Sequence, residues 1–144
     1  MELLIKLLLE VMLMSDYAKN TEWLLRLAVF GTFLGHGILA LGVKADWIKY
    51  VTFVGFSDAT ARILLPIIGM LDILVAVITL FKPIKFVLVW ATIWAFATAL
   101  IRPVYDYNTI YASGKSVFDA ITGSSVWDFV ERTANWVVPW VLLK

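Results

Sequence analysis

Residues 61–101 read ARILLPIIGMLDILVAVITLFKPIKFVLVWATIWAFATALI, and this stretch decides the fold. Two apolar runs, 61–81 and 84–101, are separated only by Lys82 and Pro83. A helix of about 20 mostly apolar residues crosses the roughly 30 Å of bilayer hydrocarbon, and a proline does not continue the helix before it. The stretch therefore predicts two antiparallel membrane-spanning helices joined by a tight turn.

Two further apolar segments flank this hairpin. One covers residues 23–41, and the other covers residues 126–143, whose first half is the more polar. Together the four segments predict an all-α fold, a membrane four-helix up-and-down bundle that occupies residues 22–144. Only one domain is expected from this length.

The first 21 residues are predicted to form a separate N-terminal amphipathic helix. Glu2, Lys6 and Glu10 are spaced four residues apart, so they fall on one helical face among apolar neighbours. The apolar stretch is too short to span a bilayer. Such a helix lies either in the membrane interface or against the bundle, and the sequence leaves both alternatives open.

The composition excludes several classes of protein. Of the 144 residues, 62% are hydrophobic and 16% are charged, whereas soluble domains have a larger charged share. The net charge of +1 offers no basic surface for nucleic acid. Cysteine is absent, which excludes disulfides and thiol chemistry. The expected location is the cell membrane, with several passes and the lipid bilayer as partner.

The distribution of lysines predicts the orientation. Five lysines fall on one side of the expected spans and three on the other: Lys6, Lys19, Lys82, Lys85 and Lys144 against Lys44, Lys49 and Lys115. Positive charge accumulates on the cytoplasmic side, so both termini are expected in the cytoplasm.

Small residues predict where the helices pack. Gly31 and Gly35 are four residues apart in the first span, and Ala91, Ala95 and Ala99 repeat the same spacing in the third. Such residues allow helix backbones to approach closely in a membrane.

Polar side chains at membrane depth are the candidate site. These ionisable or amide residues are His36, Asp72, Arg102, Asp128, Glu131, Arg132 and Asn135. A charge at the bilayer centre costs about 2.5–3.5 kcal/mol, so a charged residue at this depth is expected to have a structural or functional role. Helical spacing and depth predict that they meet in the outer half of the bundle. They form either a structural network of ion pairs or a site for a ligand or a proton.

Familiar enzyme signatures are missing from the sequence. No metal-ligand spacing, phosphate-binding glycine loop or dinucleotide fingerprint occurs. We therefore expect no bound metal ion and no covalently bound cofactor. No catalytic residue is assigned. Whether the chain is an enzyme stays open at this point.

Three segments resemble the DoxX-like family of small four-helix integral membrane proteins. They are Phe33-Leu34-Gly35-His36-Gly37-Ile38, Pro66-Ile67-Ile68-Gly69-Met70-Leu71-Asp72-Ile73-Leu74, and Glu131-Arg132-Thr133-Ala134-Asn135-Trp136 followed by Pro139. The resemblance covers about residues 22–143. It implies an accessory subunit of a membrane-bound, quinone-linked oxidoreductase complex, with other membrane subunits or further copies of the chain as partners.

Two alternatives to this role remain. The chain is a stand-alone carrier or binding protein for a small anion or a lipid-like ligand at the outer polar cluster, or it is an enzyme acting on quinone at His36 and Asp72. The non-covalent ligand expected from these alternatives is a quinone, a lipid or a small anion.

Overall fold

The computed structural model describes residues 2–123 and 125–144, and all of its regular elements in that part are helices. They are α1 (Glu2–Leu41), α2 (Ala45–Phe53), α3 (Asp58–Phe81), α4 (Lys85–Ala112), α5 (Val117–Thr122), α6 (Val126–Glu131) and α7 (Thr133–Val141). The all-α prediction is confirmed for these residues. Met1 and the side chain of Glu2 lie outside the described part of the chain. The predicted charged face of the N-terminal helix is therefore described only in part.

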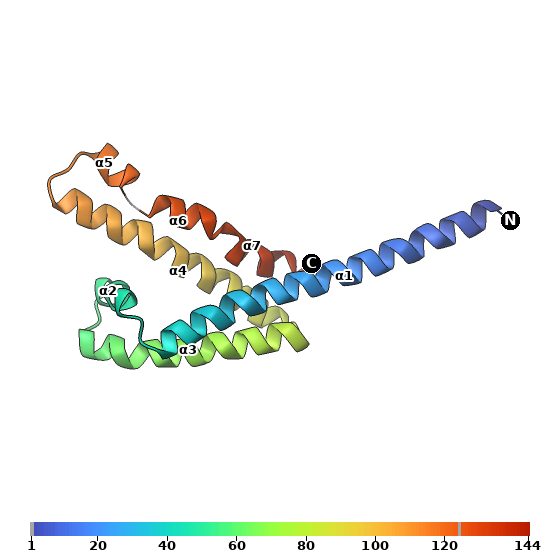
Figure 1. The fold of residues 1–144 in the computed structure, drawn as a ribbon, viewed down its shortest axis with the longest axis horizontal. Coiled ribbons are helices and arrows are strands. Elements are labelled where there is room, and N and C mark those ends of the chain that lie inside the picture. The colour runs from blue at the N-terminus through green and yellow to red at the C-terminus, as the bar shows by residue number, and fades with distance from the viewer. Residues whose placement is uncertain (1, 124) are drawn as a thin grey trace.

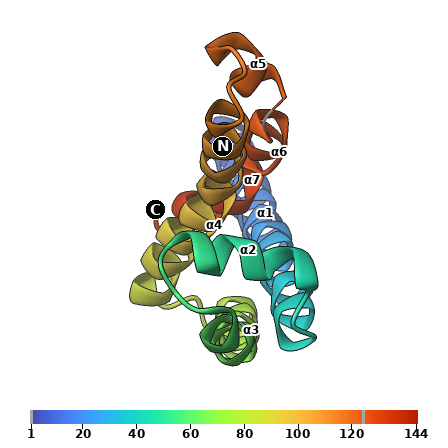
Figure 2. The ribbon, with the colours of Figure 1, turned by 90° about the vertical axis from the view of Figure 1, so that its left-hand side faces the viewer.

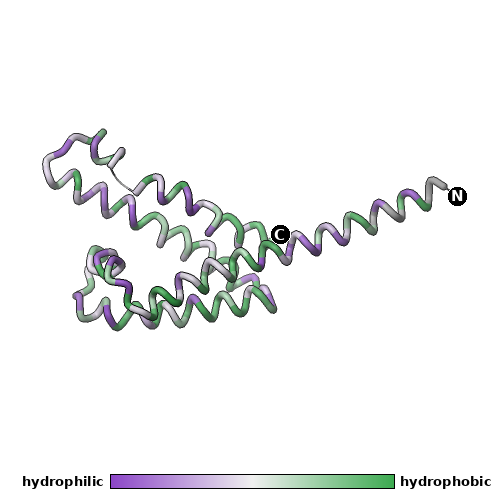
Figure 3. Tube along the Cα trace, viewed as in Figure 1, coloured by the Kyte–Doolittle hydropathy of each residue, from purple (hydrophilic) through white to green (hydrophobic). Residues whose placement is uncertain are grey.

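Three of the helices are long and apolar enough to cross a membrane. They are α1 over Ile5–Leu41, α3 and α4. Large apolar side chains point outward along them, with Phe81 and Phe86 each about three-quarters exposed. Figure 3 shows that hydrophobic residues predominate along much of the long helices. These features support the prediction of a membrane protein with transmembrane helices.

The N-terminal segment and the first predicted span form one helix rather than two. α1 continues through residue 21 without a break, and its 40 residues make it roughly 60 Å long. No glycine or proline precedes Gly31, so nothing in the sequence interrupts the helix. In Figure 1 the N-terminal half of α1 projects away from the other helices.

The fourth predicted span is divided into two short helices. The chain turns at Arg132, where φ is −84° and ψ is 6°, between α6 and α7. The amide of Asn135 bonds to the Arg132 carbonyl three residues back, at 3.0 Å or less, instead of continuing the α-helical pattern. Neither helix alone has the length of a membrane span, although the two follow one another along α4 (Figure 1).

The helices pack as two pairs. α1 packs mainly on α3, while α4 packs on α6 and α7, and the pairs meet through α1 with α7 and α3 with α4. Figure 2 shows α2 lying across one end, between these pairs. The shared core contains Val29 and Phe33 of α1, Val75 and Ala76 of α3, and Ala91 and Ala95 of α4.

One of the two predicted small-residue seams is confirmed by burial. Ala91, Ala95 and Ala99 are all buried along α4. Gly31 and Gly35 instead have no neighbouring atom within 4 Å of a Cβ placed on them. Gly37 makes the close approach to α3, because it lies two residues beyond Gly35 and therefore about 200° around the helix.

Candidate functional site

His36 is the centre of the candidate site. It lies on α1 beside Gly37, and its Nε2 is 3.4 Å from Nη1 of Arg132, at the turn between α6 and α7. The indole of Trp47 on α2 meets the imidazole edge to face, with ring centroids 5.6 Å apart. Since a guanidinium only donates, this contact requires Nε2 to be the accepting nitrogen of the ring. Three separate elements therefore converge on one side chain.

Positive charge gathers around this histidine. The charges of Arg132, Arg102 and Lys44 all act on His36. Arg102 of α4 lies over the ring of Tyr50 at 5.6 Å, and Lys44 lies over the ring of Trp47 at the same distance. We call His36, Lys44, Trp47, Arg102 and Arg132 the cationic cluster. It joins residues from α1, α2, α4 and the α6–α7 turn.

Two buried donors of the cluster have no acceptor among the described residues. They are Nε of Arg132 and Nε1 of Trp47. A buried donor without a partner costs about 1–3 kcal/mol. The indole of Trp136 and the hydroxyl of Thr79 are also unpaired, but Trp136 packs edge-on against Phe96, and Thr79 lies on the core face of α3. Within the part of the chain that the structure describes, unpaired donors accompany several positive charges only in the cationic cluster.

No carboxylate among the described residues pairs directly with a cation of the cluster. Asp106 and Asp128 act on Arg102 from a distance, and Asp106 accepts bonds from both the amide and the hydroxyl of Ser125. Within the described part of the chain, both ion pairs found lie elsewhere, the partly buried Arg26 with Glu22 and the exposed Arg62 with Asp58. The alternative of a structural ion-pair network is therefore not what the described side chains form.

The predicted site residues separate into three groups. His36, Arg102 and Arg132 come together, as expected from their depth. Asp128 and Glu131 are exposed on α6. Asp72 is only 4% exposed on α3, where Trp94 of α4 lies within hydrogen-bonding reach of it.

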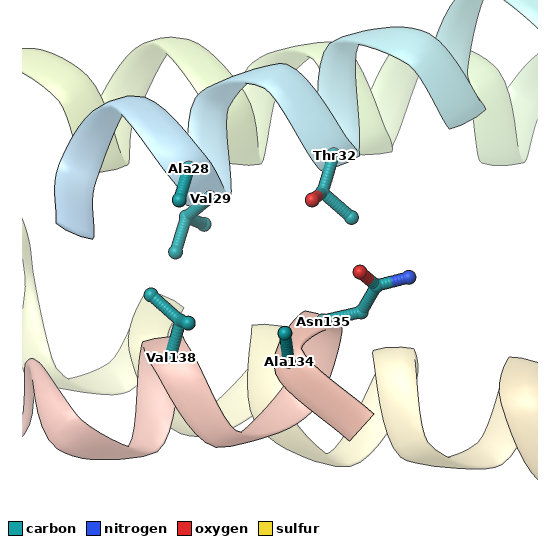
Figure 4. Close-up of a pocket in the computed structure, with 6 residues that line it drawn as sticks. All are labelled: Ala28, Val29, Thr32, Ala134, Asn135 and Val138. Atoms are coloured by element: carbon teal, nitrogen blue, oxygen red, sulfur yellow. The ribbon is translucent and has the colours of Figure 1, made fainter. Parts of the chain in front are cut away.

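Asn135 lines a separate small cavity between α1 and α7. Its amide faces Thr32 across the gap, as Figure 4 shows. The volume is about 40 Å³, and the other lining residues are apolar: Ala28, Val29, Ala134 and Val138. A space of this size holds about one or two water molecules. It has no room for a quinone ring or a lipid headgroup.

The sequence did not single out Lys44, Trp47 and Tyr50 as site residues, because they fall between the predicted spans. In the structure Trp47 and Tyr50 lie on the nine-residue helix α2, three residues apart and thus on one face. Ile48, buried on the same short helix, holds α2 against Ala61 and Leu65 of α3. In the sequence, the apolar residue Ile48 within 45–53 was the signal that could have indicated a short packed helix there.

Comparison of the chain with family models, with curated proteins and with solved structures finds no match. Among the described residues, no group of three histidine, aspartate or glutamate side chains is arranged to hold a metal ion.

Proposed function

We propose that this protein is a multi-pass protein of the cell membrane that binds a small anion or an acidic lipid-like ligand at the cationic cluster. One observation carries the proposal. Two buried N–H donors, on Arg132 and Trp47, lack acceptors beside three positive charges. An anion between them would accept both bonds and compensate the charge.

The physical setting strengthens such a site. Charge interactions are much stronger in a low-dielectric interior than in water, and charged groups at membrane depth are functional candidates. A guanidinium offers several donors in a fixed plane and suits oxyanions better than an ammonium does. The contact of Arg132 with His36 fixes one edge of that plane and leaves Nε for a ligand.

The proposed topology has four passes with both termini in the cytoplasm. The second half of α1, then α3 and α4, supply three passes, and α6 with α7 supplies the fourth, completing an up-and-down bundle. Because α1 is one uninterrupted helix, its N-terminal half would continue the axis of the first pass beyond the bilayer on the side of the termini. Support comes from Figure 1, in which the α3–α4 turn and the C-terminus lie at the same end. That end carries Lys82, Lys85 and Lys144.

Titration calorimetry on the full chain in mild detergent tests the anion site. Sodium phosphate, sulfate, acetate and succinate serve as probes, and we expect at least one to bind to the wild type. Arg132→Gln and Arg102→Gln should each weaken that binding about tenfold or more, since a bond to a charged group contributes roughly 1.5–3 kcal/mol.

Two variants provide matched controls. Arg62→Gln removes an exposed arginine that pairs with Asp58 on α3, and Glu131→Gln alters an exposed residue next to Arg132. Both should bind like the wild type. Absence of binding for every probe together with no stabilisation by an acidic lipid, or binding by the Arg102 and Arg132 variants equal to that of the wild type, would contradict the proposal.

Membership of a quinone-linked oxidoreductase complex is a second candidate. It is supported by the resemblance to DoxX-like proteins and by the N-terminal half of α1, where Met12, Leu13, Met14 and Tyr17 are all exposed. This half packs on no other helix in Figure 1 and leaves a surface for another membrane subunit. Recovery of the protein alone from a native pull-down in mild detergent would count against it.

An enzyme acting on quinone through His36 and Asp72 has less support. The charges that act on His36 come from Arg132, Arg102 and Lys44, while Asp72 lies near Trp94. An unchanged turnover in His36→Ala would eliminate this role.

A further inference from the structure

We propose that the anion is a tetrahedral oxyanion of the phosphate class, bound so that it bridges the two helix pairs. This inference rests on the proposed function and specifies its ligand. The shared chemistry is a phosphate group with several free oxygens, found either in a lipid headgroup or in a small soluble phosphate.

The donors of the cationic cluster belong to different elements. Nε1 of Trp47 belongs to α2, Nε of Arg132 to the turn between α6 and α7, and the guanidinium of Arg102 to α4. His36, at the centre, belongs to α1. A planar carboxylate presents two oxygens in one plane, which suits one guanidinium edge. A tetrahedral group directs oxygens toward several elements at once.

The charge balance also favours a dianion over a monoanion. Arg102 and Arg132 contribute two positive charges beside His36, and the exposed Lys44 adds a third at the surface. Of the two acids that act on Arg102, Asp106 is already bonded to Ser125, and Asp128 is exposed. The cluster therefore keeps an excess of positive charge that a doubly charged group compensates more fully.

The position of the cluster makes both sources of phosphate accessible. α2 lies across the end of the bundle (Figure 2), where Lys49 lies over the rings of Tyr50 and Tyr105, 5.1 Å and 5.2 Å from their centroids. Tyrosine and lysine at the end of a bundle are typical of the headgroup region of a bilayer. A headgroup could enter from the membrane, and a soluble phosphate from water.

The decisive experiment compares phosphate with carboxylates on the full chain. Inorganic phosphate and succinate are titrated in detergent, and the thermal midpoint is measured in nanodiscs of phosphatidylcholine with and without phosphatidic acid. We expect phosphate to bind at least tenfold more tightly than succinate. Trp47→Phe keeps an aromatic ring but removes the donor, and should reduce phosphate affinity about tenfold.

Arg132→Lys is the second variant, because it keeps the charge and removes the planar donor pair. It should weaken phosphate binding more than succinate binding. Trp127→Phe, at an exposed tryptophan of α6, is the matched control for the aromatic substitution and should have no effect. Binding that survives both Trp47→Phe and Arg132→Lys at the wild-type level overturns the inference.

The outcomes separate the two levels of the proposal. Equal affinity for succinate and phosphate overturns the tetrahedral ligand and leaves the anion site standing. No binding of either anion, with no effect of phosphatidic acid, overturns both. Stabilisation by phosphatidic acid alone supports a lipid headgroup as the source, whereas binding of inorganic phosphate supports a soluble source.

Discussion

Gly37 of α1 and Gly69 of α3 form a backbone crossing with no space for a side chain. A Cβ on Gly37 would lie 2.8 Å from the carbonyl oxygen of Gly69, and a Cβ on Gly69 would lie 2.6 Å from the carbonyl oxygen of Gly37. Both distances are shorter than any normal van der Waals contact. The crossing fixes α1 against α3 one residue away from His36.

Alanine at this crossing should therefore destabilise the protein. Gly69→Ala is expected to cost about 1–3 kcal/mol, because the added methyl forces the two backbones apart. Gly31→Ala and Gly35→Ala are the controls, since both positions have open space, and each should be neutral or stabilise the helix by about 0.5–1 kcal/mol. Thermal unfolding in detergent measures all three. Equal midpoints for Gly69→Ala and Gly35→Ala would refute the crossing.

The alanine seam of α4 should reject larger side chains. Ala91 is completely buried among Val29, Phe33 and Val75, so Ala91→Leu should lower stability by about 1–3 kcal/mol through overpacking. Ala97 is exposed on the same helix, and Ala97→Leu should leave the unfolding midpoint close to that of the wild type. A tolerated leucine at residue 91 would show that α4 packs through another face.

Asp72 and Trp94 should be coupled in a double-mutant cycle. Removing either partner leaves the other polar group buried without its neighbour, so the losses from Asp72→Ala and Trp94→Phe should not add. We expect a coupling energy of roughly 0.5–3 kcal/mol, measured by thermal unfolding of the single and double variants. Asp72→Ala combined with Trp127→Phe, at an exposed position, should be additive. Additive losses for Asp72→Ala and Trp94→Phe would mean that the two side chains do not interact.

The exposed pair between Asp58 and Arg62 should contribute little to stability. Its side chains are 61% and 58% exposed, and their contact distance is 2.8 Å. Exposed ion pairs typically contribute about 0–1 kcal/mol. Arg62→Gln should therefore change the unfolding free energy by less than about 0.5 kcal/mol, which also qualifies it as the binding control. A loss several times larger would mean that Arg62 has a partner outside this chain.

Single cysteines can test the four-pass topology directly, because the natural sequence contains none. Lys82→Cys and Lys144→Cys should react with a membrane-impermeant maleimide only when the inner face is opened. Lys115→Cys, in the connection after α4, should react from outside. Labelling of Lys144→Cys from the same side as Lys115→Cys would mean that α6 and α7 do not cross the membrane.

The hairpin of α3 and α4 could be predicted from sequence because its signals are local. Length, apolar content and the Lys82-Pro83 turn need no knowledge of neighbours. The alanine seam was also accessible, since burial of Ala91, Ala95 and Ala99 follows from small residues on one face. Depth along the helices led us to expect His36 near Arg102 and Arg132, but the same argument also placed Asp72 with them, whereas Asp72 lies beside Trp94.

The parts that were missed depend on contacts between distant segments. Gly31 and Gly35 carry the same spacing as a packing seam, yet the partner helix selects the face of Gly37. The turn at Arg132 likewise depends on the packing of α6 and α7 on α4, and the position of α2 depends on its packing on α3. Trp47 enters the site only because α2 is folded across the end of the bundle, and no local pattern contains that information.

The uninterrupted α1 has a mechanical consequence. His36 and the projecting N-terminal half belong to one rod, and the roughly 30 residues from Lys6 to His36 span about 45 Å. At Gly37 and Gly69, next to His36 in the sequence, the backbone of this rod makes its close contact with α3. A curved bilayer or a bound subunit that tilted the projecting arm about this crossing would therefore move His36 relative to Arg102 and Arg132.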